Sequence, residues 1–137
     1  MRQLAGCDKP LNPNDMPAPI PPPDSHYISL TQFLDMKDRY GNNSEKILAP
    51  AWQGKDILAT SELFNVIAVN AVAAVPGCAA VRIYYGMDES FRVHAMLVAV
   101  DINSQDILPA AGGVIFEKNA SDPPIVEEGQ RCPPFCP

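Results

Sequence analysis

Proline is concentrated near the two ends of this 137-residue chain and is rare in its middle. The N-terminal region holds prolines at positions 10, 13, 17, 19 and 21–23, and the C-terminal region holds them at 123, 124, 133, 134 and 137. Proline fixes φ and lacks an amide donor, so it interrupts helix interiors and central strands. We therefore expect an extended arm over residues 1–27, a single domain over 28–118, and a Cys- and Pro-rich tail over 119–137.

The middle of the chain contains a pattern typical of an antiparallel strand pair. Val81, Ile83 and Tyr85 alternate with polar or aromatic residues, which predicts a strand over 81–85. A second strand is expected over 91–100, after a short connection over 86–90. This second strand becomes apolar at every position after residue 95, so it should be central or covered on both faces.

Two helices are expected before this strand pair. Ser29 and Gln32 form a capping-box pattern for a helix over 28–40, which Gly41 and the two asparagines after it should end. A longer helix is expected over 61–75, capped by Thr60 or Ser61 and buried on most sides because it is apolar nearly all round. Shorter helical turns are expected over 44–48 and 55–58.

Two further strand candidates follow, at Ile107-Leu108 and over Gly113–Glu117. Together these patterns predict the α+β class. N-terminal helices should pack on a small antiparallel sheet of three or four strands, with extended proline-rich arms at both ends.

The charge pattern argues against two classes of partner. The formal net charge is −6, and the Lys and Arg residues are scattered. Nucleic acids and anionic membrane surfaces both require clustered basic residues, so we expect neither as a partner. The apolar stretch Leu63–Val75 is too short to insert in a bilayer. The N-terminus lacks the apolar run of a secretory signal, so a cytoplasmic location is expected; the alternative is extracellular, by another export route or after removal of a leader.

Four cysteines, Cys7, Cys78, Cys132 and Cys136, are candidates for disulfides. Cys132 and Cys136 could bridge each other, or reach Cys7, Cys78 or a neighbouring chain. A bridge from the tail to Cys78 would close about fifty residues and stabilise the fold by roughly 3–5 kcal/mol. A zinc site would need two further ligands, and the remaining cysteines and both histidines are isolated in sequence, so no metal or cofactor is expected.

Four polar residues, Arg82, Tyr84, Arg92 and His94, could share one face of the strand pair. Such a cluster could bind an anion or a partner's carboxylate. The simpler interpretation is cross-strand pairing on a solvated face. No catalytic residue is predicted, because no nucleophile, base and orienting acid are marked by the local sequence.

Three segments resemble a group of small uncharacterised bacterial proteins of Bacteroidota type. They are Pro76–Gly86, with its Pro-Gly-Cys and Arg-Ile-Tyr-Tyr-Gly residues, Leu97–Leu108, and the closing Glu128–Cys136 with its Cys-Pro-Pro-Phe-Cys residues. The turn at Asn103-Ser104-Gln105 and the proline-rich arm over 10–23 depart from that group. The group has no known activity, so the resemblance supports the fold and the tail and assigns no catalytic residue.

We therefore expect a non-catalytic structural or interaction protein that associates with itself through its terminal arms, with a filament subunit as one version of this hypothesis. One alternative is a small cytosolic enzyme or ligand-binding module that uses the hairpin face. Another is a small secreted effector.

Overall fold

The computed structural model describes residues 19–109 and 123–137. Most of the expected N-terminal arm, Cys7 and the strand expected over Gly113–Glu117 lie outside the described residues. The described elements confirm the α+β class: two α-helices accompany one antiparallel sheet of three strands and one of two.

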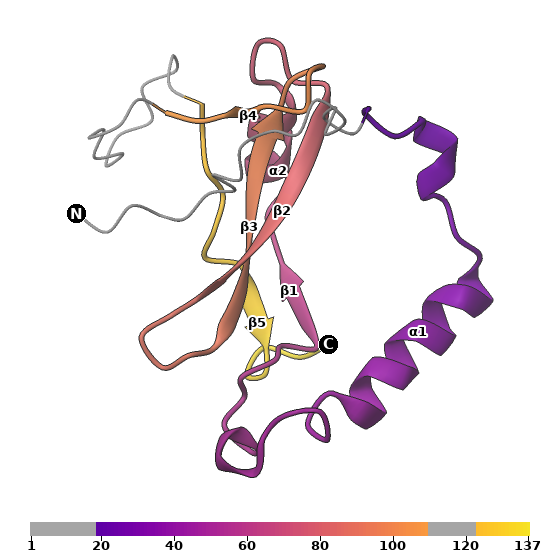
Figure 1. Cartoon of the computed structure of the whole chain (residues 1–137), viewed down its shortest axis with the longest axis vertical. Coiled ribbons are helices and arrows are strands. Elements are labelled where there is room, and N and C mark those ends of the chain that lie inside the picture. The colour runs from indigo at the N-terminus through magenta and orange to yellow at the C-terminus, as the bar shows by residue number, and fades with distance from the viewer. Residues whose placement is uncertain (1–18, 110–122) are drawn as a thin grey trace, which may run out of the picture.

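The larger sheet has the order β2-β3-β4, with β3 in the centre (Figure 1). β2 (Ala80–Met87) pairs along its whole length with β3 (Val93–Val100), in a register that runs from Ala80↔Val100 to Met87↔Val93. β4 (Asp106–Ile107) pairs with the end of β3. The predicted hairpin is therefore confirmed, and each strand begins or ends within about two residues of its expected position.

The second sheet joins segments far apart in sequence. β1 (Ser61–Leu63) pairs with β5 (Gln130–Cys132), so that Ser61 lies opposite Cys132. The described end of the chain, expected to be a loop, is thus held to the domain by a strand. A second contact precedes it, where Val126 and Leu97 exchange backbone hydrogen bonds of 2.8 and 3.1 Å.

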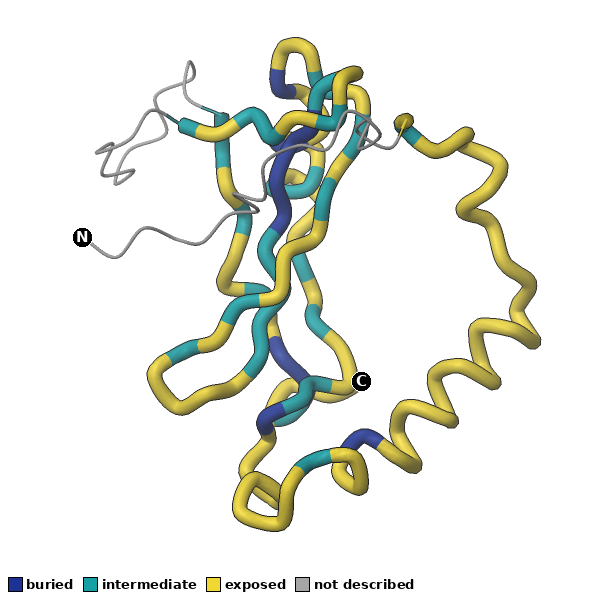
Figure 2. The backbone as a smooth tube through the Cα atoms, in the orientation of Figure 1, coloured by how far each residue is buried: buried dark blue, intermediate teal, exposed yellow. Residues whose placement is uncertain are grey.

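β3 is hydrogen-bonded on both edges. β2 occupies one edge, and on the other the amide of Val93 donates to Ile57 O at 2.7 Å and the amide of Ala95 donates to Glu62 Oε1 at 3.1 Å. Val126 and β4 complete that edge. The last four residues of β3 are all buried (Figure 2), which confirms the prediction of a central strand.

The core forms where α2 (Val66–Ala73) packs on β3. Val72 and Ala99 are fully buried there, and Val75 and Leu97 nearly so. The sequence prediction for the start of this helix is wrong: Ser61–Leu63 is a strand, and the helix is capped not by Thr60 or Ser61 but by Asn65, whose Oδ1 accepts from the amide of Ile67 at 2.8 Å. The first turn of α2 is also largely exposed, so the helix is not buried on most sides.

α1 (Leu30–Asn43) has the predicted capping box. Ser29 Oγ accepts from the amide of Gln32 at 3.1 Å, and Gln32 Oε1 accepts from the amide of Ser29 at 2.9 Å. The helix buries none of its residues and lies to one side of the sheets (Figures 1 and 2). Its C-terminal part is tied to the domain by Tyr40, whose hydroxyl donates to Ala59 O at 2.7 Å.

Two short 3-10 helices complete the described elements. η1 spans Pro23–His26, inside the segment expected to be extended, and η2 spans Pro50–Trp52. The helical turn expected over 55–58 does not form; Asp56 there has a positive φ of 53°. The Trp52 ring instead contacts the hairpin turn, with its centroid 5.3 Å from that of Phe91.

Candidate functional site

The four polar residues predicted on the hairpin face belong to two separate clusters. By the β2–β3 register, Arg82, Tyr84 and His94 do lie on one face, since Gly86 is opposite His94 and Tyr84 is opposite Met96. Arg82 and Tyr84 bind a carboxylate at the β4 end of the sheet, whereas His94 and Arg92 bind a different one at the hairpin turn.

The first cluster centres on Asp106 of β4. Arg82 Nη1 and the Tyr84 hydroxyl each donate to one carboxylate oxygen of Asp106, and Arg82 Nη2 donates to Ser104 O at 3.2 Å. The hydrogen bond to Asp106 is the main reason why the pKa of Tyr84 is raised. Because both donors already bind a carboxylate within the chain, this cluster ties β2 to β4 and does not present a cation to a ligand.

The second cluster centres on Asp88, in the turn between β2 and β3. Asp88 Oδ1 accepts from the amides of Ser90 and Arg92 at 2.9 and 3.1 Å. Its Oδ2 accepts from Arg92 Nε at 3.0 Å and lies 2.9 Å from His94 Nε2. These contacts, the hydrogen bond with His94 first, lower the pKa of Asp88. The cluster therefore fixes the shape of the hairpin turn.

A buried arginine that the sequence did not single out joins the two sheets. The Arg131 side chain is 6% exposed. Its Nε donates to Val93 O at 2.9 Å, and its Nη2 donates to Asp56 O at 2.9 Å and Ile57 O at 3.1 Å. Arg131 Nε also lies 4.0 Å from Glu62 Oε1, so the charge is paired with a carboxylate that is itself 9% exposed. No local signal marks this role, because Arg131 stands alone between loop-forming residues.

Carboxylates also surround the other side of the His94 ring. His94 Nδ1 lies 3.3 Å from Glu127 Oε1 and 3.9 Å from Glu62 Oε1. His94 Nδ1 and Glu62 Oε2 are buried without a hydrogen-bond partner. Even so, within residues 19–109 and 123–137 no group of three or more His, Cys, Asp or Glu side chains is arranged to hold a metal ion.

The cysteines of the tail bridge each other. Cys132 and Cys136 form a disulfide, and Cys78 is a thiol that donates to Ala80 O at 3.2 Å. The possible bridge from the tail to Cys78 is therefore not formed, because the chain closes a much shorter loop instead.

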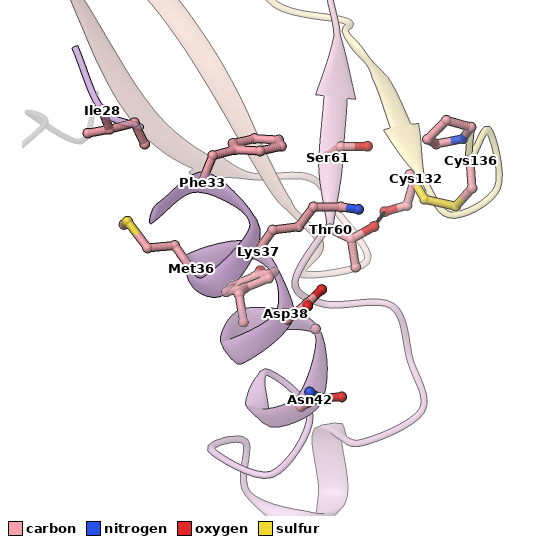
Figure 3. Close-up of a pocket in the computed structure, with 13 residues that line it drawn as sticks. Ile28, Phe33, Met36, Lys37, Asp38, Asn42, Thr60, Ser61, Cys132 and Cys136 are labelled. Carbon is pink, nitrogen blue, oxygen red and sulfur yellow. Dashed lines mark hydrogen bonds between the residues drawn. A yellow bond between two sulfur atoms is a disulfide. The ribbon is translucent and has the colours of Figure 1, made fainter. Parts of the chain in front are cut away.

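Two cavities are lined by other residues. The larger, about 920 Å³, lies between α1 and the β1–β5 pair (Figure 3). It is lined by Phe33, Met36 and Tyr40 of α1, by Ser61, and by the disulfide cysteines. The smaller, about 370 Å³, lies between Tyr40 and the sheet residues Ile83, Tyr85 and Leu97. Neither of these two cavities is lined by Arg82, Tyr84, Arg92 or His94.

The open edge of β2 is the most unusual surface of the described chain. Val81, Ile83, Tyr85 and Met87 are 43%, 51%, 78% and 64% exposed. The amide of Asp88 donates to Arg92 O, so these two residues form a hydrogen-bonded pair. Hydrogen-bonded pairs recur at every second residue of an antiparallel pair of strands, so the backbone groups of the even-numbered residues of β2 bond to β3. The amides and carbonyls of the odd-numbered residues point outward, and the described residues offer them no partner.

Comparison of the chain with protein-family models, curated proteins and solved structures gave no match in any of the three. Neither helix in the described part of the chain has the length and apolar composition needed to cross a membrane.

Proposed function

We propose that this chain is a non-catalytic interaction protein that associates with further copies of itself, and that β2 supplies the contact. The observation that carries the proposal is the edge of β2: eight residues long, apolar, and without a hydrogen-bond partner among the described residues. The polar residues of the hairpin face support a structural role, because each pairs with a carboxylate within the chain.

An open strand edge is a template for another strand. Soluble proteins usually protect such edges with lysines, prolines, bulges or a covering loop. β2 contains no lysine and no proline, and its one charged residue, Arg82, is already bound by Asp106. Addition of a strand would satisfy the outward backbone groups and cover apolar side chains, with a second copy as the partner.

The sequence of β2 is compatible with antiparallel pairing to itself. With a twofold axis at Ile83, Val81 lies opposite the partner's Tyr85, and Arg82 lies opposite the partner's Tyr84. An arginine beside an aromatic ring is a favourable pair. An axis moved to Arg82 would instead place two arginines opposite each other, and like charges directly opposite are destabilising. Charge therefore favours the register centred on Ile83 over the one centred on Arg82.

Sedimentation velocity of the full chain over a range of concentrations tests the proposal. We expect concentration-dependent association that Ile83→Lys reduces at least tenfold, because the substitution places a charge at the axis. Ile102→Lys is the matched control, since Ile102 is 71% exposed in the turn after β3 and should leave association unchanged. A wild-type chain that sediments as a monomer at every concentration would exclude the proposal.

The disulfide bears on where association takes place. Disulfides persist in oxidising compartments and are rare in the cytosol. The Cys132–Cys136 bridge therefore favours the extracellular alternative over a cytoplasmic location. Four reactive thiols in protein taken from its native source and denatured without reductant would contradict this.

A further inference from the structure

α1 presents a second exposed apolar surface in the described part of the chain. Leu30, Phe33, Leu34 and Met36 are 71%, 51%, 43% and 59% exposed. A 14-residue helix is marginally stable in water by itself, and most helices are stabilised by packing an apolar face. Among the described residues, the Tyr40 hydrogen bond to Ala59 fixes the C-terminal part of α1 to the domain.

The groove beside α1 has features that identify what could fill it. Figure 3 shows Lys37 reaching from α1 towards Thr60, with Asp38 next to it on the helix, so the middle of the groove carries one basic and one acidic residue. Gly41 lies one turn further on, and a Cβ added there would meet no atom within 4 Å. The groove is therefore open at Gly41 and has both signs of charge at its centre.

We propose that α1 packs antiparallel against α1 of a second copy, about a twofold axis between Lys37 and Asp38. Each Lys37 then meets the partner's Asp38, and each Leu34 meets the open surface at the partner's Gly41. Residues 34, 37, 38 and 41 lie on one face because they are three or four positions apart. This contact rests on the proposed self-association and adds a second surface to it.

Two different twofold contacts in one chain have a definite consequence. A copy that pairs through β2 still presents its unused α1, and a copy that pairs through α1 still presents its unused β2 edge. Each added copy therefore leaves a new surface for the next one. The assembly extends as a filament in which β2 and α1 contacts alternate, and it does not stop at a closed dimer.

Charge reversal at the axis tests the α1 contact without changing the apolar surface. Lys37→Glu places the new glutamate opposite the partner's Asp38, so two acidic residues meet. Asp38→Lys places the new lysine opposite the partner's Lys37, so two basic residues meet. The double variant with Lys37→Glu and Asp38→Lys restores opposite charges. Negative-stain microscopy and sedimentation should show wild-type filaments, dimers for each single variant and for Ile83→Lys, and filaments again for the double variant.

Replacement of an apolar residue of the contact by a charged one provides an independent check. Leu34→Glu should also yield dimers, because Leu34 lies on the proposed contact face of α1. Ile47→Glu should not, because Ile47 is 75% exposed and lies beyond the end of α1. A wild-type dimer that Ile83→Lys dissociates and Lys37→Glu leaves unchanged would overturn the α1 contact and keep the β2 contact. Filaments unaffected by Lys37→Glu would also overturn the α1 contact. A wild-type monomer would overturn both contacts.

Discussion

At the scale of single residues, three charged side chains, those of Arg131, Asp88 and Asp106, hold segments of the fold together. Arg131 donates to three backbone carbonyls from segments about 40 to 75 positions away in sequence, and so fixes β5 against β3 and the 56–57 segment. Carbonyls that water cannot reach must be satisfied by the chain itself. Arg131 is therefore a structural residue, and the same holds for Asp88 and Asp106.

Removal of the Arg131 guanidinium should destabilise the fold strongly. Arg131→Met leaves three carbonyls and the buried Glu62 carboxylate without their cation, which should lower the free energy of unfolding by about 3–5 kcal/mol. The exposed Arg92→Met should cost less than about 1 kcal/mol. Urea denaturation measures both, and equal effects of the two substitutions would contradict the role given to Arg131.

Asp88 should make the stability of the hairpin depend on acid pH. Its pKa in the folded chain is below the ordinary value, so the folded state binds this proton less readily than the unfolded state does. The stabilisation from Asp88 is thus complete above about pH 4 and declines as the pH falls towards the lowered folded pKa. The gap in unfolding free energy between wild type and Asp88→Asn should narrow below about pH 4, with Glu89→Gln as the control for loss of a charge. A gap that does not change between pH 7 and pH 2 would refute this.

At the scale of elements, the tail is held by a short strand and a short covalent loop. β5 pairs with β1, and the disulfide follows directly at the end of β5. Thr60, directly before β1, adds two hydrogen bonds to this pair: its amide and its hydroxyl both donate to Cys132 O, at 2.9 and 3.1 Å. The stability of the β1–β5 pair therefore depends mainly on non-local hydrogen bonds.

Loss of the disulfide should have a moderate effect. Its two cysteines are separated by 4 positions, and in the chain-entropy model so short a loop stabilises by about 2 kcal/mol. Replacement of Cys132 and Cys136 by serine should lower the free energy of unfolding by that amount. Cys78→Ser should change it by less than about 1 kcal/mol, since serine keeps the hydrogen bond to Ala80 O. A loss of 4 to 5 kcal/mol for the double variant would indicate that a longer loop had been closed.

Local pattern explains which elements the sequence could predict. The capping box of α1 and the alternation in β2 act over a few residues, so both could be inferred. β1 and β5 could not, because three residues carry almost no periodicity and each strand exists through a partner about 70 positions away. The four polar residues were expected to share one face of the strand pair. The carboxylates that divide them between two clusters, Asp88 and Asp106, could not be inferred, because they lie in a turn and a two-residue strand.

At the scale of the whole molecule, burial is uneven among the described elements. The end of β3 and α2 form the core, while α1 and the outer edge of β2 remain exposed (Figure 2). Both open surfaces expose apolar side chains, and on α1 these lie near one basic and one acidic residue, Lys37 and Asp38. Association of copies would cover them, which accounts for apolar residues that a monomer would place in water.

Amide hydrogen exchange at β2 tests the central claim most directly. In the single chain the amides of Arg82 and Tyr84 bond to β3, whereas those of Val81, Ile83 and Tyr85 point outward. We expect the outward amides to exchange rapidly in dilute protein and at least tenfold more slowly in concentrated protein, while those of Arg82 and Tyr84 are slow in both. Rapid exchange of Val81, Ile83 and Tyr85 at every concentration would contradict pairing through β2.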